Sequence, residues 1–144
     1  MIIEVKIQDS AGPMIKSLQK GLADTTDLTQ KVGFILQAQI QDNAMSGHGH
    51  HDGGYPNAPT GRMAGSVTTR LISPARAIVG TNVFYAPFVE FGHSQHIGQF
   101  VPPLKKRLVN ARAPAYPFFF KAIAQTADKV QKLIVDYINK LVGK

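Results

Sequence analysis

The sequence predicts an α+β fold: a small antiparallel sheet, made of an N-terminal strand and a later hairpin, packed by a long N-terminal helical region and a C-terminal amphipathic helix. Apolar and polar residues alternate at residues 2–7 and on both sides of residues 73–76, which is the period of a half-buried strand. Elsewhere apolar residues return every three to four positions, as they do on a helix. At 144 residues, the chain is expected to form one domain, 1–144, without metal or disulfide support.

The first strand is expected at residues 2–7, with one face made of Ile3, Val5 and Ile7. A helical region then runs from about residue 13 to residue 43, because apolar residues recur there at helical spacing: Ile15, Leu18, Leu22, Leu28, Val32, Ile35 and Leu36. Asp27 and Gln30 have the spacing of a capping box. The region is therefore either two helices or one helix with a kink.

Residues 45–59 are expected to form a long loop, because they contain four glycines and two prolines. Four of the loop residues are potential metal ligands: His48, His50, His51 and Asp52. Their spacing fits no standard zinc pattern, and ordering a glycine-rich loop would cost conformational entropy. An exposed polar loop is the favoured interpretation, so neither a metal nor a cofactor is predicted.

A hairpin is expected next. From about residue 65 onward, one face consists of Val67, Thr69 and Leu71, and the other of Thr68, Arg70 and Ile72. Residues 77–83 are expected to form the second strand. Residues 73–76, with the sequence S-P-A-R, supply the turn between them. The hairpin leads directly into the most aromatic part of the chain.

This aromatic stretch is residues 83–92, V-F-Y-A-P-F-V-E-F-G. It is expected to form a short helical turn with Pro87 near its start, closed by Gly92 in a left-handed conformation. Phe84, Phe88 and Phe91 are spaced to share one face of that turn. The stretch is either the core of the fold or an interface between molecules, because large aromatic side chains dominate the energetics of both.

Glu90 is the single carboxylate of that stretch. A carboxylate among so many aromatic side chains must find a hydrogen-bond donor, because an unpaired buried charge is very costly. Arg62 is one candidate for its partner, and a donor from another chain is the other. A pairing of Glu90 with His93 as acid and base is conceivable by spacing, but a structural carboxylate is the favoured interpretation.

Residues 93–114 are expected to form a second long, irregular loop, which carries the most basic cluster of the chain: Lys105, Lys106, Arg107 and Arg112. A long loop inside a compact domain is usually functional or disordered. The last helix is expected at residues 117–142. Its apolar stripe would consist of Phe119, Ile123, Ala127, Val130, Ile134, Tyr137 and Leu141.

The net charge of +7 is unevenly distributed. Residues 1–58 hold four lysines against six acidic residues, a balance of −2, and residues 59–144 hold twelve basic residues against three acidic ones, a balance of +9. A basic surface of this kind favours nucleic acid, anionic lipid or an acidic protein surface as a partner, or is simply a solvated face.

No catalytic constellation is present in the sequence. The chain has no cysteine, no Gly-x-Ser-x-Gly elbow and neither a phosphate loop nor a dinucleotide fingerprint. Residues 1–8 lack the pattern of a signal peptide, and no apolar run approaches the length of a membrane span. A non-enzymatic, soluble protein made in the cytoplasm, without a membrane partner, is therefore predicted.

Three motifs in the second half of the chain occur in a family-specific order. They are T-G-R-x-x-x-S-V from residue 60, V-G-T-N-V-x-Y-A-P-F-V-E-F-G-H from residue 79, and P-F-F-x-x-A-I from residue 117. In this order the chain resembles the gene-product-ten-like family of tail-completion and neck proteins (head–tail joining or minor tail proteins) of long-tailed bacteriophages. Residues 85–92 are the most specific part of the resemblance. Family members often carry a short link where this chain has residues 93–113.

The resemblance implies a structural virion protein that forms part of a subunit ring at the head–tail junction and is needed for tail completion or head–tail joining. Its partners would be other copies of itself, neighbouring neck, connector and tail-tube proteins, and passing DNA without sequence specificity. It would be located in the virion, at the head–tail junction or tail, and in the host cytoplasm during assembly. The resemblance leaves open whether the protein is a neck ring or a tail terminator.

The residues expected to serve this assembly role are Arg62, Tyr85, Phe88, Glu90, Phe91, Lys105, Lys106 and Arg107. Tyr85, Glu90 and Phe91 would fix the position of the short helix, and the two loops would contact neighbouring subunits or the next ring. The alternative is a basic nucleic-acid-binding protein, for which the sequence offers the basic cluster but no base-reading helix. A metal-dependent hydrolase would require ligands beyond the histidine-rich loop.

Overall fold

The protein is described from a computed structural model, which describes residues 1–6, 24–47, 56, 61–102 and 105–142. The fold is α+β, as the sequence predicts. In chain order its elements are β1 (Ile2–Lys6), α2 (Thr26–Met45), α3 (Arg62–Gly65), β2 (Val67–Ser73), β3 (Arg76–Thr81), α4 (Ala86–Phe91), β4 (His93–Ser94), β5 (Phe100–Val101), β6 (Lys106–Arg107), β7 (Arg112–Ala113) and α5 (Phe119–Val142). Two predictions lie outside the described residues: the first part of the helical region, residues 13–23, and the histidine-rich part of the first loop.

The main sheet has the strand order β1-β3-β2, and both pairings are antiparallel. Ile3 is opposite Val79, and Val79 is in turn opposite Thr69, so these residues share one face of the sheet. The N-terminal strand and the hairpin are thus confirmed, including the turn between them.

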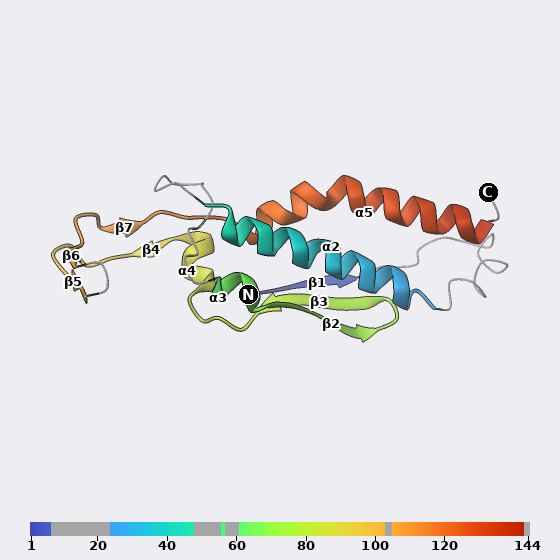
Figure 1. Ribbon diagram of the computed structural model, residues 1–144, viewed down its shortest axis with the longest axis horizontal. Coiled ribbons are helices and arrows are strands. Elements are labelled where there is room, and N and C mark those ends of the chain that lie inside the picture. Colours follow the sequence, from blue (N-terminus) through green and yellow to red (C-terminus); the bar gives the residue numbers. More distant parts are fainter. Residues whose placement is uncertain (7–23, 48–55, 57–60, 103–104, 143–144) are drawn as a thin grey trace.

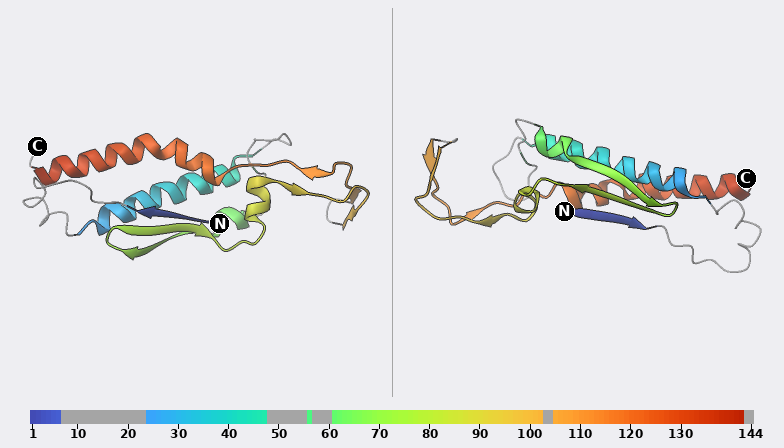
Figure 2. Two further views of the ribbon diagram at one scale, coloured as in Figure 1. Left: turned by 180° about the vertical axis from the view of Figure 1, so that it is seen from behind. Right: turned by 90° about the horizontal axis from the view of Figure 1, so that it is seen from below.

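Helices α2 and α5 lie side by side and run in opposite directions above the sheet (Figures 1 and 2). Gly33 of α2 lies so close to β2 that a Cβ atom there would come within 2.5 Å of the Thr69 side chain. Thr69 Oγ1 also donates a hydrogen bond of 3.0 Å to the Gly33 carbonyl oxygen. The start of α2 is tied to the hairpin turn, because the hydroxyl groups of Thr25 and Thr29 both donate to the carbonyl oxygen of Pro74.

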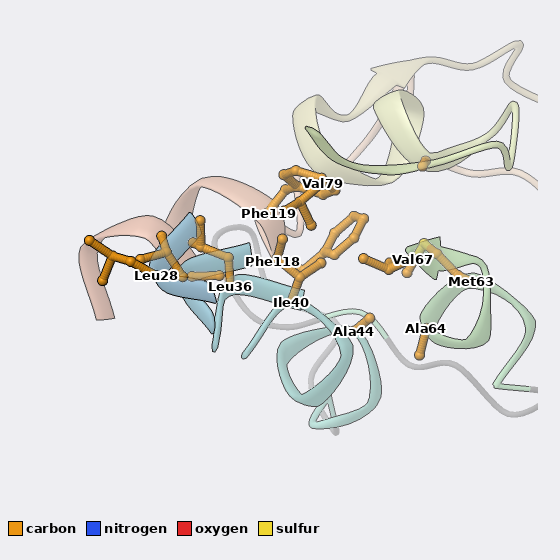
Figure 3. Packing of buried hydrophobic residues seen from close by; sticks show 13 residues of the cluster. Leu28, Leu36, Ile40, Ala44, Met63, Ala64, Val67, Val79, Phe118 and Phe119 are labelled. Atoms are coloured by element: carbon orange, nitrogen blue, oxygen red, sulfur yellow. The ribbon is translucent and has the colours of Figure 1, made fainter. Parts of the chain in front are cut away.

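A hydrophobic core fills the space between the helices and the sheet (Figure 3). Phe118 and Phe119, at the start of α5, have no exposed surface, and burial of each such side chain contributes about 1.5–3 kcal/mol. The remaining members come from α2, α3, β2, β3 and α4 as well as α5: Leu28, Val32, Leu36, Ile40, Ala44, Met63, Ala64, Val67, Val79, Ala86 and Ala122. The core therefore joins these elements, and Ile3 and Val5 of β1 pack against it.

Two details of the helices differ from expectation. The predicted capping box of α2 is wrong: Asp27 pairs with Lys31 at 2.6 Å, and Asp24 Oδ1 instead accepts a hydrogen bond of 3.0 Å from the Thr26 N–H group. In α5, Ile123 and Ala127 are exposed, and the buried positions beside them are Ala122 and Thr126. Small side chains at these two positions allow α5 to approach α2 closely.

The predicted irregular loop at residues 93–114 is also wrong. Strand β4 pairs with β7 and β5 pairs with β6, both antiparallel. Further backbone hydrogen bonds join the two pairs, from the Gln95 N–H group to the Ala111 oxygen and from the Gly98 N–H group to the Leu108 oxygen, each 2.8 Å. The described residues of 93–102 and 105–113 therefore form a two-stranded ribbon, called the arm below, which projects beyond the helices and the main sheet (Figures 1 and 2).

Candidate functional site

The base of the arm is held by Glu90, the last but one residue of α4. Its carboxylate accepts three hydrogen bonds from backbone N–H groups at the start of α5: Oε2 from Phe118 at 2.8 Å and from Phe119 at 2.9 Å, and Oε1 from Phe120 at 3.0 Å. Glu90 is only 2% exposed. This arrangement, called the Glu90 clamp below, is an N-terminal cap supplied by a different helix.

The physical reason for the clamp lies in the start of α5. The first N–H groups of a helix have no partner within the helix, and the partial positive charge at that end favours an anion. Hydrogen bonds to an ionised carboxylate are also stronger than neutral ones. The three N–H groups and the carboxylate thus satisfy one another in a place that is closed to water.

Two further contacts fix the same point. The Tyr116 N–H group donates to the Val89 carbonyl oxygen at 2.8 Å, and the buried Asn43 of α2 donates through Nδ2 to the Phe118 carbonyl oxygen at 3.0 Å. The start of α5 is therefore held from α4 on one side and from α2 on the other.

Helix α4 lies where the sequence predicts it. Pro87 stands in its first turn, where its missing N–H group costs nothing. Gly92 ends the helix with a φ angle of +69° and a ψ angle of 175°, a conformation open to glycine but different from the predicted left-handed helical one. A Cβ atom at Gly92 would lie 2.6 Å from the Ala113 carbonyl oxygen. Gly92 thus allows the two strands at the base of the arm to meet.

The phenylalanines of the aromatic stretch lie on the surface. Phe84, Phe88 and Phe91 are 81%, 50% and 54% exposed, and Phe120 at the start of α5 is 49% exposed. These four side chains are called the aromatic patch below. The side chains of Phe91 and Phe120 contact each other, with ring centroids 5.8 Å apart. The sequence left two interpretations of this stretch, the core of the fold and an interface between molecules. The exposure of its phenylalanines favours the interface.

Ring contacts extend the aromatic patch at both ends. Phe84 meets Tyr85 edge to face, with ring centroids 5.5 Å apart, and Phe88 meets His93, the first residue of the arm, at 5.6 Å. His93 therefore contacts an aromatic side chain. Exposed apolar side chains that are gathered in this way typically mark an interaction site.

The arm carries the basic cluster. Lys105, Lys106, Arg107 and Arg112 are all exposed. Arg107 Nη1 donates to the Gly98 carbonyl oxygen across the arm at 2.7 Å. Three apolar side chains of the arm are exposed as well: Ile97, Phe100 and Val109. The arm is thus a surface of mixed basic and apolar character.

The predicted site residues fall into three places. Tyr85, Phe88, Glu90 and Phe91 belong to α4 or precede it directly, and Lys105, Lys106 and Arg107 lie near the tip of the arm. Arg62 is the first residue of α3 and is exposed. Glu90 is held by the backbone N–H groups of Phe118, Phe119 and Phe120, a set of donors that the sequence did not indicate.

The sequence reasoning missed two residues that this site uses. Phe120 completes the aromatic patch, and its signal was the run of three phenylalanines at residues 118–120. Asn43 holds the start of α5 from below, and no local pattern marks a buried asparagine that serves a distant helix.

Within the described part of the chain, no group of three or more His, Cys, Asp and Glu residues could hold a metal ion. No helix in that part is long and apolar enough to cross a membrane. Comparison of the chain with family models, with curated proteins and with solved structures gives no match.

Proposed function

We propose that the protein is a structural component of a bacteriophage particle, which forms part of a subunit ring at the head–tail junction and is needed for tail completion or for joining the tail to the head. Arg62, Tyr85, Phe88, Glu90, Phe91 and the basic residues of the arm are its proposed assembly residues. The proposed partners are other copies of the chain and the adjacent neck and tail-tube proteins.

The observation that carries the proposal is the pairing of an exposed aromatic patch with a buried clamp beneath it. A soluble monomer gains nothing from exposing four phenylalanines on adjoining helices, whereas an assembly subunit can bury them against a neighbour. The Glu90 clamp holds α4 against the start of α5, so that the patch keeps one shape. A fixed shape lowers the entropy cost of association.

The resemblance described from the sequence centres on the same residues. The motif at residues 85–92 contains Glu90, Phe88 and Phe91, and the motif P-F-F-x-x-A-I contains the N–H groups that Glu90 binds. The two motifs are thus the two halves of one clamp. This gives a physical reason for both motifs to occur together in a chain, which supports the proposal.

The experiment is electron microscopy of lysates from the phage or prophage that carries the gene, with a stop codon placed early in it. The expected result is filled heads beside separate tails, or beside tails of irregular length. Separate tails of normal length would indicate a joining role, and irregular lengths would indicate a terminator role. A plasmid copy of the intact gene should restore complete particles.

Normal particles from the stop-codon phage would overturn the proposal. They would favour the alternative, a basic nucleic-acid-binding protein that acts outside the particle. A plasmid copy that carries Glu90→Ala should fail to restore particles, because the clamp that orders the patch is lost. If that variant restored complete particles fully, the Glu90 clamp would not be needed for assembly.

A further inference from the structure

We infer that the arm is a contact element for duplex DNA, which binds phosphates on both walls of the major groove through Lys105, Lys106, Arg107 and Arg112. The inference rests on the proposed function only for the source of that DNA, the genome that passes the head–tail junction. The binding itself is a property of the isolated chain and can be measured without a phage.

The charge of the arm is of a single sign. From Gly92 to Ala127 the sequence contains no Asp or Glu, and the arm holds four of the sixteen basic residues. Duplex DNA carries one negative charge per about 1.7 Å of its axis and has the opposite field.

The shape of the arm fits a groove better than a flat surface. Antiparallel pairing places Phe100 opposite Arg107 and Val101 opposite Lys106. Paired residues share a face and successive residues alternate, so Lys106 and Arg107 point to opposite faces of the ribbon. A flat partner would meet one face only, whereas the major groove admits a two-stranded ribbon and has a phosphate backbone on each side.

Lys105, beside the tip of the arm, has a defined backbone position. Lys105 has a φ angle of +51°, and its N–H group donates to the Pro102 carbonyl oxygen at 3.1 Å, which closes the turn. The bond from Arg107 to the Gly98 oxygen engages one Nη atom and leaves further donors of the guanidinium for phosphate. The exposed Phe100 adds apolar contact with bases or sugars.

The test is the salt dependence of binding of the full chain to a fluorescently labelled duplex of mixed sequence. Four phosphate contacts predict that the logarithm of the association constant falls against log salt with a slope of about −3.6. This is a loss of about 150-fold in affinity between 50 and 200 mM salt. The double variant Lys105→Gln/Lys106→Gln should reduce the slope by about two units, because each lysine accounts for about one contact.

The matched control is Lys129→Gln/Lys132→Gln, which removes the same charge from two exposed lysines of α5. It should leave the slope unchanged. An equal reduction of the salt slope in the two double variants would overturn the inference. DNA binding would then depend on the net charge of the chain and not on the lysines of the arm. Absence of duplex binding at 50 mM salt would also overturn the inference. An acidic protein surface would then be the expected partner of the arm.

Binding to a single strand of the same sequence is the comparison that separates recognition of the major groove from simple attraction to phosphates. The inference expects the duplex to bind more tightly, and tighter binding of the single strand would contradict it. Failure of this inference would leave the proposed function intact, because the stop-codon phage reports particle assembly and not DNA affinity. Conversely, normal particles from the stop-codon phage would overturn the proposed function, and the measured binding of the arm to DNA would still stand.

Discussion

Oε2 of Glu90 accepts a hydrogen bond of 2.9 Å from the N–H group of Phe119, a residue 29 positions further along the chain. The acceptor lies in the last turn of α4 and the donor begins α5, and both residues are buried. Through this bond the position of α4, with the aromatic patch on it, depends directly on the position of α5.

Glu90→Ala should destabilise the protein by about 3 kcal/mol. The substitution removes an N-terminal cap, worth about 1–2 kcal/mol, and leaves buried N–H groups without an acceptor. Glu90→Gln should have an intermediate effect, because its amide keeps one acceptor oxygen but turns a donor toward the same N–H groups. Urea denaturation measures both.

The control for this prediction is Glu4→Ala, which removes the only other glutamate of the chain. Glu4 pairs with Arg76 at 2.7 Å on an exposed part of the sheet, so its loss should cost less than about 1 kcal/mol. Equal unfolding midpoints for the two alanine variants would contradict the role of the clamp.

Replacing two residues of the aromatic patch, Phe84→Ser together with Phe88→Ser, should leave stability nearly unchanged, with each substitution within about 0.5 kcal/mol as is usual for surface sites. The same variant should lose assembly, measured by restoration of particles to the stop-codon phage. Phe118→Ala is the contrasting core variant and should cost about 3–5 kcal/mol. A double serine variant that restores particles fully would show that the patch is not an interface.

Gly92→Ala should destabilise the protein by about 3 kcal/mol, because the positive φ angle and the contact of the new Cβ with the Ala113 oxygen both oppose it. The matched control is Gly98→Ala. Gly98 has a φ angle of +83° but nothing within 4 Å of the Cβ position, so only the backbone term, about 1 kcal/mol, applies. Equal unfolding temperatures of the two variants would argue against close packing of Gly92 on Ala113 at the base of the arm.

Asp24 provides a pH prediction. Hydrogen bonds from the hydroxyl and the N–H group of Thr26 hold the pKa of the Asp24 carboxyl below its ordinary value of 3.8. The folded pKa is depressed, so the stabilising contribution is fully present above pH 3.8 and is lost as the pH falls through the folded value. A carboxyl NMR titration should place the Asp24 midpoint below 3.8 and should move it upward in Thr26→Ala. A wild-type midpoint at or above 3.8 would contradict the cap at the start of α2.

The elements that local patterns define could be predicted from the sequence. The alternation around Val5 and Val67 and the turn residues at Pro74 are local signals, and they place β1, β2 and β3 correctly. Pro87 and Gly92 likewise bound α4, because their backbone preferences act on their own residues. The fold class followed from these signals.

The partner of Glu90 could not be predicted, because no local rule places the N–H groups of Phe118 beside a residue 28 positions earlier. The arm was missed for a different reason. Its strands contain two residues each, which is too short for any periodicity to be visible. In α5 the apolarity of Ile123 was misleading, since the packed position beside it is the smaller Ala122.

The central position of β3 in the main sheet has a consequence for the order of folding. Ile2 pairs with Gly80, so β1 cannot find its neighbour in the sheet until synthesis has reached residue 80. The hairpin of β2 and β3 closes a much shorter loop and can form beforehand, at lower entropic cost. The last strand to join the sheet is therefore the first one that is made.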